Sequence, residues 1–418
     1  MNVILKSAKI LDPESTFNNQ VVDIKIENGI ITQIETNIPD SADFKIVNLP
    51  DLCVSKGWFD SSVSFGEPGY EDRETILNGL QTAAKSGFTG VALQPNANPV
   101  IDNQSQVYFV KSKAANQATT LYPIGAFTKN SEGLDLAEMF DMQNAGAVAF
   151  GDYQKSTSNA NLLKIGLQYT QDFNGLVLAF CQDKTIKGNG VVHEGIVSTT
   201  LGLKGIPALA EELEVARNLF LLEYTGGKLH IPTISTAKSV KLIKEAKAKG
   251  LQVTCSVAVH NLVLTDDILT EFDTRTKVLP PVRTEEHRKA LLNGVLDGTI
   301  DVITSDHNPL DVELKKMEYD KAKFGTIGLE SAFGALQTVL PTEVIIDKLT
   351  AGSKIFSAQQ SVIEVNQKAN ITLFNTTTAY TFTKQNIQAK SKNAIFLNHQ
   401  LKGKVYGIYN NQKLVVNE

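Results

Sequence analysis

Histidine, cysteine and tryptophan are scarce in this chain, which has six, three and one of them among 418 residues. So few histidines limit the metal sites that the chain can build. The cysteines are far apart and form no Cys-x-x-Cys pair, so the sequence excludes a disulfide framework and favours reduced thiols in the cytoplasm. These cysteines are Cys53, Cys181 and Cys255.

Long apolar runs and an excess of one charge are absent as well. No apolar stretch is long enough to cross a bilayer, and the first residues, MNVILKSAKILDPES, lack the apolar core of a signal peptide. Lys and Arg number 40 against 45 Asp and Glu, which leaves a net charge of −5. This balance argues against a nucleic-acid or membrane-surface binder. We therefore expect a cytoplasmic protein whose partners are neither nucleic acid nor membrane.

The two ends of the chain are rich in short strands. Near the N-terminus, Asn28-Gly29 separates two alternating runs and favours a type I′ hairpin turn, because both residues tolerate positive φ. The C-terminal end also contains short strand-like runs, with a second turn expected at Asn410-Asn411. Because chain ends often lie close together, residues 1–55 and 363–418 are expected to form one small β-sandwich domain.

Between these ends, short apolar runs alternate with amphipathic stretches, several of which end in Gly. Eight candidate strands separated by helices over residues 56–362 predict an α/β fold, a (β/α)8 TIM barrel. An open, doubly wound sheet is the alternative, but no Gly-x-Gly-x-x-Gly follows the first strand. The candidate strands are GWFDSSVSF, GVALQP, TLYPIGAF, AVAFGD, GLVLAFC, KLHIPTIS, LQVTCSV and IDVITSD.

In a barrel of this kind, chemistry is carried by residues at the carboxyl ends of the strands. Ser62 and Ser64 are two residues apart, so both point to the same side of the first strand. Two histidines at that spacing would form one edge of a metal site, whereas neutral hydroxyls are poor ligands for a divalent ion. The other candidates at strand ends are Asn96, Asp152, Phe180, Gln182, Asp183, Thr233, His260, Asp306 and His307.

Several long blocks of the sequence resemble the dihydroorotases of the amidohydrolase superfamily, in their class I bacterial type. The resemblance covers nearly the whole chain. It implies a metal-dependent (β/α)8 hydrolase barrel with a small β-sandwich from both termini, and a place in de novo pyrimidine synthesis. The blocks are GWFDSSVSFGEPGYEDRETILNGLQTAAKSGFTGVALQPNANPV, HEGIVSTTLGLKGIPALAEELEVARNLFLLEYTGGKLHIPTISTAKSV, KVLPPVRTEEHRKALLNGVLDGTIDVITSDHNPL and FGTIGLESAFGAL.

The chain departs from this family where the family binds its metals and its substrate. The family pattern after the first strand is Asp-x-His-x-His-x-Arg, of which only Asp60 matches. The two histidines fall on Ser62 and Ser64, and the arginine that holds the substrate carboxylate falls on Gly66. Apolar or hydroxyl residues also stand at further positions that are histidine or asparagine in the family, namely Phe180, Thr233, Leu279 and Leu310.

Two carboxylates of the family site remain. The resemblance implies that Asp306 is the general base and a metal ligand, and that Asp152 bridges the metals. Without the histidines, Asp306 is more simply a vestigial structural acceptor, and Asp152 has the same two interpretations. A weak Mg²⁺ or Ca²⁺ site between the two is a third. The residues that the resemblance places beside the substrate are Asn96, Phe324 and Gly325.

The remaining histidines are interpreted mainly as structural residues. His230 lies within a strand and is expected to be a satisfied core histidine. His260 and His307 could serve as replacement ligands, but His307 should face away from Asp306 in an extended segment. Surface positions are expected for His193, His287 and His399.

No metal cofactor is therefore expected, with zinc only if the family site is retained in another form. A catalytic zinc takes about three protein ligands and a water, and only Asp152 and Asp306 remain here. Without a metal, water keeps a pKa near ~15.7 instead of ~7, so the nucleophile is lost at neutral pH. The absence of the arginine also removes bidentate recognition of a carboxylate.

Three functions remain open. The first is a catalytically defective member that acts as a structural or regulatory partner of aspartate carbamoyltransferase, as the family's metal-ligand-deficient members do. The second is an active dihydroorotase with a rearranged site, and the third is metal-free hydrolysis of another cyclic amide by Asp306, with Cys181 as nucleophile. The first is favoured because the losses cluster at the site while the scaffold blocks are intact. We also expect a homo-oligomer, most simply a dimer.

Overall fold

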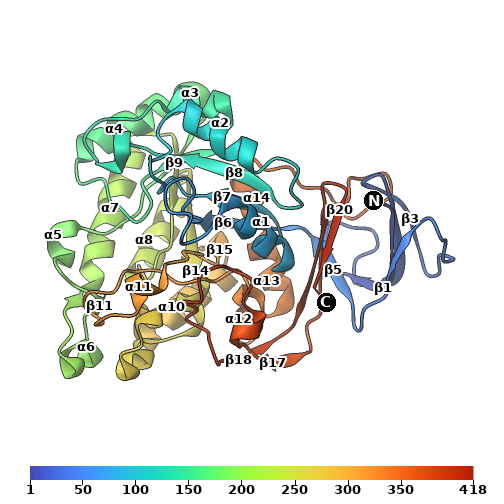
Figure 1. Cartoon of the computed structure of the whole chain (residues 1–418). Helices are drawn as coiled ribbons and strands as arrows, with labels where there is room; N and C mark the ends of the chain where they lie inside the picture. The colour runs from blue at the N-terminus through green and yellow to red at the C-terminus, as the bar shows by residue number, and fades with distance from the viewer. Residues whose placement is uncertain (418) are drawn as a thin grey trace.

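The computed structural model describes residues 1–417 and has two parts (Figure 1). A barrel surrounded by helices forms the larger part, and a sheet built from both ends of the chain lies at one side of it. This architecture confirms the predicted α/β fold, a (β/α)8 barrel with a small β unit from both termini. The predicted domain boundaries, at 1–55 with 363–418 and at 56–362, stay a prediction.

The barrel strands lie side by side in sequence order, and every hydrogen-bonded pair is parallel. The first and last strands meet at a seam, where the Ser64 amide donates to the His307 carbonyl at 2.8 Å. All the predicted strands are confirmed. They are β6 (Trp58–Val63), β7 (Phe88–Leu93), β8 (Thr120–Gly125), β9 (Ala149–Gly151), β10 (Leu176–Leu178), β13 (Lys228–Ile231), β14 (Val253–Ala258) and β15 (Val302–Thr304).

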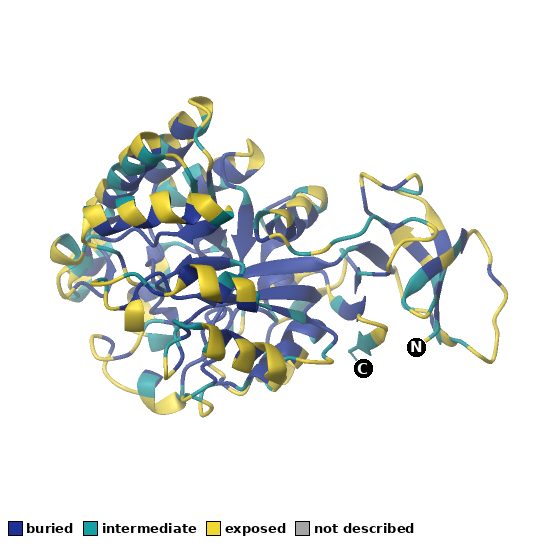
Figure 2. Cartoon of the chain, turned by 90° about the horizontal axis from the view of Figure 1, so that it is seen from above, coloured by how far each residue is buried: buried dark blue, intermediate teal, exposed yellow. Residues whose placement is uncertain are grey.

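Helices cover the outer face of the barrel and strand side chains fill its interior, so the strands are buried on both faces and are rich in apolar residues. Figure 2 shows the buried strands in the interior and the exposed residues on the outer sides of the helices. Side-chain caps set several helix starts; the Thr75 hydroxyl, for example, accepts from the Asn78 amide. The longer helices are α1 (Ile76–Lys85), α2 (Gln104–Lys113), α3 (Met139–Ala145), α4 (Ala160–Tyr169), α7 (Ala208–Thr225), α8 (Ala237–Ala248), α10 (Glu285–Leu296) and α13 (Thr342–Thr350).

Shorter elements occupy the connections. Within the described residues, no helix combines the length and the apolar character needed to cross a membrane. The short elements are α5 (Lys184–Lys187), β11 (Val192–His193), α6 (Ile196–Leu201), β12 (Gly205–Ile206), α9 (Val259–Val263), α11 (Val312–Lys315), α12 (Ala332–Leu336), α14 (Gly352–Ile355), and the 3₁₀ turns η1 (Lys129–Ser131), η2 (Thr170–Phe173), η3 (Asp266–Glu271), η4 (Thr274–Thr276) and η5 (Lys384–Asn386).

The terminal sheet is mixed, and its C-terminal strands form one block that pairs directly with the block of N-terminal strands. Most of its buried apolar side chains form a core cluster of their own, while Phe374 and Cys53 belong to the core cluster of the barrel. A separate two-stranded sheet lies nearby. In spatial order the large sheet contains β20 (Lys413–Val416), β19 (Val405–Asn410), β16 (Ile371–Phe374), β5 (Cys53–Lys56), β1 (Val3–Ile10), β2 (Val21–Glu27) and β3 (Ile30–Glu35), with β4 (Lys45–Val47) beside β1; the small sheet is β17 (Ala379–Thr381) with β18 (Gln400–Lys402).

The two predicted hairpin turns have different outcomes. Asn28 and Gly29 have φ of 51° and 85°, as the predicted type I′ turn between β2 and β3 requires. The second turn is one residue later than predicted, at Asn411 and Gln412, with φ of 50° and 58°. Asn410 instead ends β19, because its side-chain amide donates to the buried Ala118 carbonyl at 2.8 Å.

Trp58, the single tryptophan, joins the barrel to the terminal sheet. Its fully buried ring stacks on Phe333 at 4.8 Å between centroids and also contacts Phe374 of β16 and Phe88 of β7. Its Nε1 donates to the Ser55 hydroxyl at 3.0 Å. One side chain thus packs against two sheets and a helix.

We predict that Trp58→Ala lowers the free energy of unfolding by about 3–5 kcal/mol, because it leaves a large cavity at this junction. Urea unfolding followed by far-UV circular dichroism measures the change, since the variant has no tryptophan fluorescence. Tyr108→Ala removes a half-exposed aromatic ring from α2 and should change stability by less than about 1 kcal/mol. Equal losses in the two variants would contradict the prediction.

Candidate functional site

The carboxyl ends of the barrel strands converge on one small pocket, which we call the barrel mouth. The structure brings together five residues that the sequence singled out: Ser62, Asp152, Phe180, Thr233 and Asp306. They leave about 10 Å³ of free volume, roughly the room that one water molecule needs. The remaining residues of the barrel mouth are Gln94, Gly151, Tyr153, Gln154, Leu178 and Pro232.

Asp306 is the central acidic group of the barrel mouth. Its Oδ1 accepts from the Ser62 hydroxyl at 3.1 Å and from the Tyr153 hydroxyl at 3.2 Å. Burial, with a smaller contribution from the nearby Asp60 charge, raises its pKa to about 7, against the opposing effect of the two hydroxyls. Burial and Asp306 together raise the pKa of Tyr153, so its phenol remains a proton donor. Asp306 can therefore hold a proton near neutral pH.

The backbone of the barrel mouth has a conformation that its side chains do not favour. Asp306 and Thr233 have φ of 46° and 49°, in the left-handed region. A β-branched residue such as Thr rarely adopts this conformation, and its surroundings must hold it there. The Thr233 amide is fixed by the Ser256 hydroxyl at 3.1 Å.

Asp152 is turned toward the loop that follows β8. Its carboxylate accepts from the Phe127 amide at 3.1 Å, from the Thr128 amide at 3.2 Å, and from the Thr128 hydroxyl. Burial raises its pKa, and these bonds oppose the rise. Its acceptor positions are thus largely used within the protein, as the structural interpretation of this residue expects.

The residues present do not fit the binuclear metal site that the family resemblance implies. Among residues 1–417, no three His, Cys, Asp or Glu side chains lie together in a way that could hold a metal ion. Asp152 and Asp306 are the acids at the barrel mouth, and the other former ligand positions carry a ring or a hydroxyl. We therefore derive no chemical step through a metal.

The substituted positions have packed against one another. Phe180 and Leu279, which align with a family histidine and asparagine, form one buried cluster with Ile206, and Phe324 packs against it. Phe324 also lies under the Lys277 ammonium, which is 5.0 Å from the ring centroid. Two polar positions of the family have thus become an apolar plug above the barrel mouth.

The other residues implied to contact substrate lie outside the barrel mouth. The Asn96 amide donates to the Ser64 hydroxyl at 2.9 Å. The Gly325 amide donates to the Lys277 carbonyl at 3.0 Å, and its carbonyl accepts from the Asn393 side chain at 3.1 Å. These groups are bonded within the protein.

Sequence reasoning missed three residues of the barrel mouth. Gln94 donates to the Ser62 hydroxyl at 3.1 Å, and its position two residues before Asn96, at the end of the same strand, could have identified it. Tyr153 and Gln154 follow Asp152 directly, and the Gln154 amide donates to the Leu279 carbonyl at 2.9 Å. No spacing in the sequence indicates this last contact.

Two predictions about histidines have opposite outcomes. His230 is a satisfied core residue, as predicted, with its ring nitrogens 2.8 Å from the Thr254 hydroxyl and 3.3 Å from the Ser256 hydroxyl. The prediction that His193 is a surface residue is wrong, because its ring is buried and lies 3.0 Å from a guanidinium nitrogen of Arg283. β11, which contains His193, packs against the loop before α10, which contains Arg283.

Cys181 is poorly suited to nucleophilic catalysis. Its thiol is buried, and burial with the charges of Glu214 and Glu211 raises its pKa well above the usual value. A thiol must lose its proton to attack a carbonyl group, so this environment keeps it inert. It contacts the Asn218 amide at 3.3 Å and lies outside the barrel mouth.

The fold is shared with solved hydrolase structures. L-Hydantoinase (dihydropyrimidinase) from Arthrobacter aurescens superposes with a TM-score of 0.86 at 19% identity, covering 100% of this chain and 96% of that protein. A D-hydantoinase superposes with a TM-score of 0.84 at 17% identity. At these identities the likeness shows the fold alone, a (β/α)8 barrel with a sheet from both ends of the chain.

The sequence comparisons are more specific. A family model described as Dihydro-orotase-like matches residues 53–239. Dihydroorotase from Pelotomaculum thermopropionicum is 40% identical over 410 residues, 96% of this chain and 96% of that protein. Dihydroorotase from Thermoanaerobacter sp. (strain X514) is 40% identical over 412 residues, 97% and 95% of the two chains. The chain therefore belongs to the dihydroorotase family.

The raised pKa of Asp306 predicts a pH-dependent stability. Because its folded-state pKa is about 7 and an unfolded aspartate titrates near ~3.9, its contribution to stability is complete below about pH 4 and is lost as pH rises to about 7. The slope is about 1.4 kcal/mol per pH unit in that window. Asp306→Asn should therefore gain stability relative to the wild type as pH rises from 4.5 to 7.5.

Urea unfolding across this pH range measures the effect. Asp141→Asn, which changes an exposed carboxylate on α3, is the matched control and should follow the wild-type curve. Parallel curves for Asp306→Asn and the wild type would show that the carboxyl titrates alike in the folded and unfolded states.

Proposed function

We propose that this chain is a catalytically silent member of the dihydroorotase family, and that it supports aspartate carbamoyltransferase in pyrimidine biosynthesis as a structural or regulatory partner. The observation that carries the first part is the barrel mouth. It has about 10 Å³ of free volume and two acids where a metal-dependent hydrolase needs imidazole ligands and space for a substrate. A cytoplasmic location fits this role and the three unpaired thiols.

The arrangement retains a base but lacks a nucleophile. Asp306, with a pKa of about 7, could accept a proton at neutral pH. Water that no metal binds keeps a pKa near ~15.7, so the carboxylate would have to generate the nucleophile alone. The apolar plug of Phe180, Leu279 and Phe324 also occupies space above the base. These features favour a vestigial site.

An active dihydroorotase with a rearranged site is the second candidate, and the retained Asp306 is the observation that favours it. Opening the barrel mouth would require Phe180 and Tyr153 to move away from the acid. Movement of two buried aromatic side chains is costly unless a substrate provides compensating contacts. Metal-free hydrolysis through Cys181 is disfavoured by its raised pKa.

We predict that the purified protein holds no stoichiometric zinc and converts neither dihydroorotate nor carbamoyl aspartate faster than buffer. Inductively coupled plasma mass spectrometry and a coupled absorbance assay measure the two quantities. Asp306→Asn is the matched variant, and its rate in the absorbance assay should equal that of the wild type. About one zinc per chain, together with turnover that Asp306→Asn abolishes, would favour the active dihydroorotase instead.

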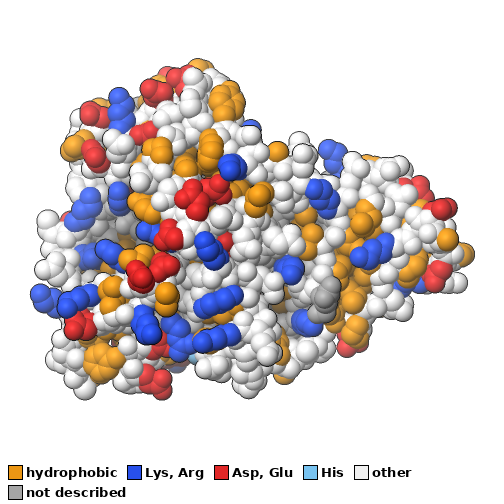
Figure 3. Space-filling model, in the orientation of Figure 1, with side chains coloured by type: hydrophobic (Ala, Val, Ile, Leu, Met, Phe, Trp, Pro, Cys, Tyr) orange, Lys and Arg blue, Asp and Glu red, His pale blue; other side chains and the backbone are white. Residues whose placement is uncertain are grey.

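The proposal of a partner is supported by an intact scaffold and by apolar side chains on the surface. Leu209, Leu213, Phe220 and Tyr224 lie on one side of α7 at helical spacing, and the last two are 70% and 78% exposed. Exposed apolar stripes of this kind are typical of protein–protein contacts. Lys and Arg are interspersed with Asp and Glu on the face shown in Figure 3. A homodimer of the chain within such an assembly remains part of the proposal.

Co-expression with the aspartate carbamoyltransferase of the same organism tests the partnership. We expect one peak in size-exclusion chromatography that contains both chains, through a contact of at least about 1,000 Å². Phe220→Ser should weaken co-elution if α7 forms the contact, whereas Tyr108→Ser, on the distant α2, should not. Two separate peaks with unchanged transferase activity would contradict the partnership.

A further inference from the structure

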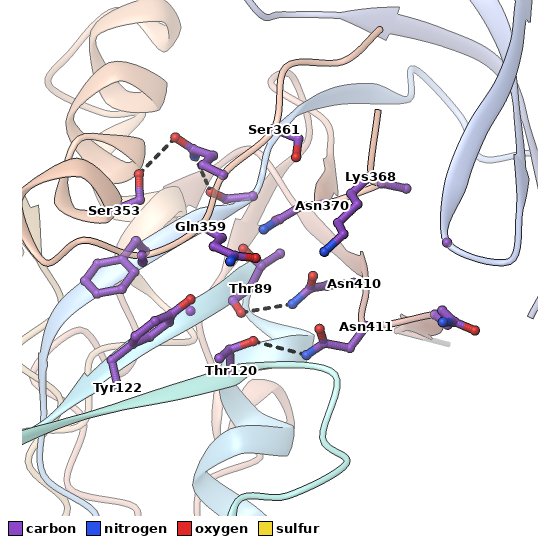
Figure 4. A pocket seen from close by; sticks show the side chains of 18 of the residues that line it. Thr89, Thr120, Tyr122, Ser353, Gln359, Ser361, Lys368, Asn370, Asn410 and Asn411 are labelled. Atoms are coloured by element: carbon purple, nitrogen blue, oxygen red, sulfur yellow. Dashed lines mark hydrogen bonds between the residues drawn. The ribbon is translucent and has the colours of Figure 1, made fainter. Parts of the chain in front are cut away.

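A cavity of about 550 Å³ lies at the opposite end of the barrel from the mouth, between the barrel and the terminal sheet (Figure 4). Gly57, Thr89 and Thr120, at the amino ends of β6, β7 and β8, form its barrel side. The two hairpin turns of the terminal sheet form part of the other side, and a segment after α14 completes it. Its volume is in the range of small-molecule sites, which is about 300–1,000 Å³.

The cavity is lined by polar side chains and one positively charged side chain. Its lining consists of amide and hydroxyl side chains, two aromatic rings, a few glycines and small apolar residues, and one lysine. None of the described residues that line it is a carboxylate. The lysine is Lys368, which is exposed and forms no ion pair with any residue of 1–417. In Figure 4 its ammonium points toward Asn370 and Asn410. A cationic group without a counter-charge beside polar side chains favours an anionic ligand.

The amides of the cavity present unused acceptors. Asn370 Oδ1 is buried and has no hydrogen-bond partner among the described residues, which is costly for a polar atom. This oxygen packs closely against the backbone of Gly57. Only glycine allows this packing, because a Cβ on Gly57 would lie 1.8 Å from the oxygen. Asn411 Nδ2 donates to the Thr120 hydroxyl at 3.1 Å, which leaves the Asn411 side-chain oxygen as an acceptor.

Asn410 has the same arrangement as Asn411. Its Nδ2 donates to the Ala118 and Thr89 carbonyls at 2.8 and 3.2 Å, which fixes the amide and leaves its oxygen as an acceptor. The acceptor oxygens of Asn410 and Asn411 thus come from the same turn at the edge of the cavity, whereas Asn370 Oδ1 is buried against Gly57 (Figure 4). Such acceptors match the hydroxyl groups of a ligand better than they match its carbonyl groups.

We propose that this cavity binds a small hydroxylated organic anion, a sugar-like molecule with a phosphate or carboxylate head. Lys368 pairs with the anionic head, and the oxygens of Asn410 and Asn411 accept from the hydroxyl groups. The ligand contacts both the barrel and the terminal sheet, so binding stabilises their junction. The site is separate from the barrel mouth, and its occupancy is independent of whether the mouth is silent.

Isothermal titration calorimetry of the full chain tests the site with three probes: ribose 5-phosphate, gluconate and ribose. We expect at least one of the two anions to bind near one per chain and ribose to bind about tenfold more weakly or not at all, because a charge-assisted bond is lost. If only ribose 5-phosphate binds, the head group is a phosphate; if only gluconate binds, it is a carboxylate. Failure of both anions to bind, or equal binding of ribose, would overturn the proposal.

Variants separate this site from non-specific anion binding. Lys368→Gln removes the cation from an exposed position, so the fold is retained. It should weaken the binding of the anion about tenfold or more. Lys241→Gln removes an equally exposed cation from α8, outside the cavity, and should bind as the wild type does. Asn411→Ala removes an acceptor from the cavity and should weaken the binding of the anion and any residual binding of ribose. Unchanged binding in Lys368→Gln would refute the assignment.

Discussion

Parallel strands β6 and β15 meet at a seam with little backbone pairing, and the buried Asp60 bonds across it. Its carboxylate accepts from the Ser305 amide of the last strand's end at 3.0 Å, from the Thr304 hydroxyl, and from the Ser62 amide at 3.0 Å. The rest of the barrel depends on this closure, because an open seam would expose buried strand edges. The acid that the family pattern retains here therefore has a structural role in closing the barrel.

The seam also determines the chemistry of the barrel mouth. It holds Asp306 beside Ser62 and near the Asp60 charge, in surroundings that raise its pKa to about 7. A cationic group would counter the burial of these acids, and no His, Lys or Arg is among the described residues that line the barrel mouth. Instead Phe180 and Leu279 have formed an apolar plug with Phe324. Packed apolar side chains at these positions favour stability, because buried polar groups without partners are costly.

The two ends of the barrel thus differ in what they can bind. The mouth, where this family's chemistry belongs, has room for about one water molecule. The opposite end has a polar cavity of about 550 Å³ with one unpaired lysine. A ligand at the junction of the barrel and the terminal sheet would change the stability of both, whatever happens at the barrel mouth.

The sequence by itself determined the eight barrel strands, the hairpin at Asn28-Gly29 and the loss of the histidine ligands, because apolar periodicity, turn chemistry and ligand type are local properties. It placed the last turn one residue early and put His193 on the surface, since both depend on contacts with distant residues. Only the tertiary structure decided that Phe180 meets Leu279, that Asp306 lies beside Ser62 in surroundings that raise its pKa, and that Lys368 and Asn410 line one cavity. Each joins residues far apart in the chain, and packing density and dielectric surroundings arise only when the chain is folded.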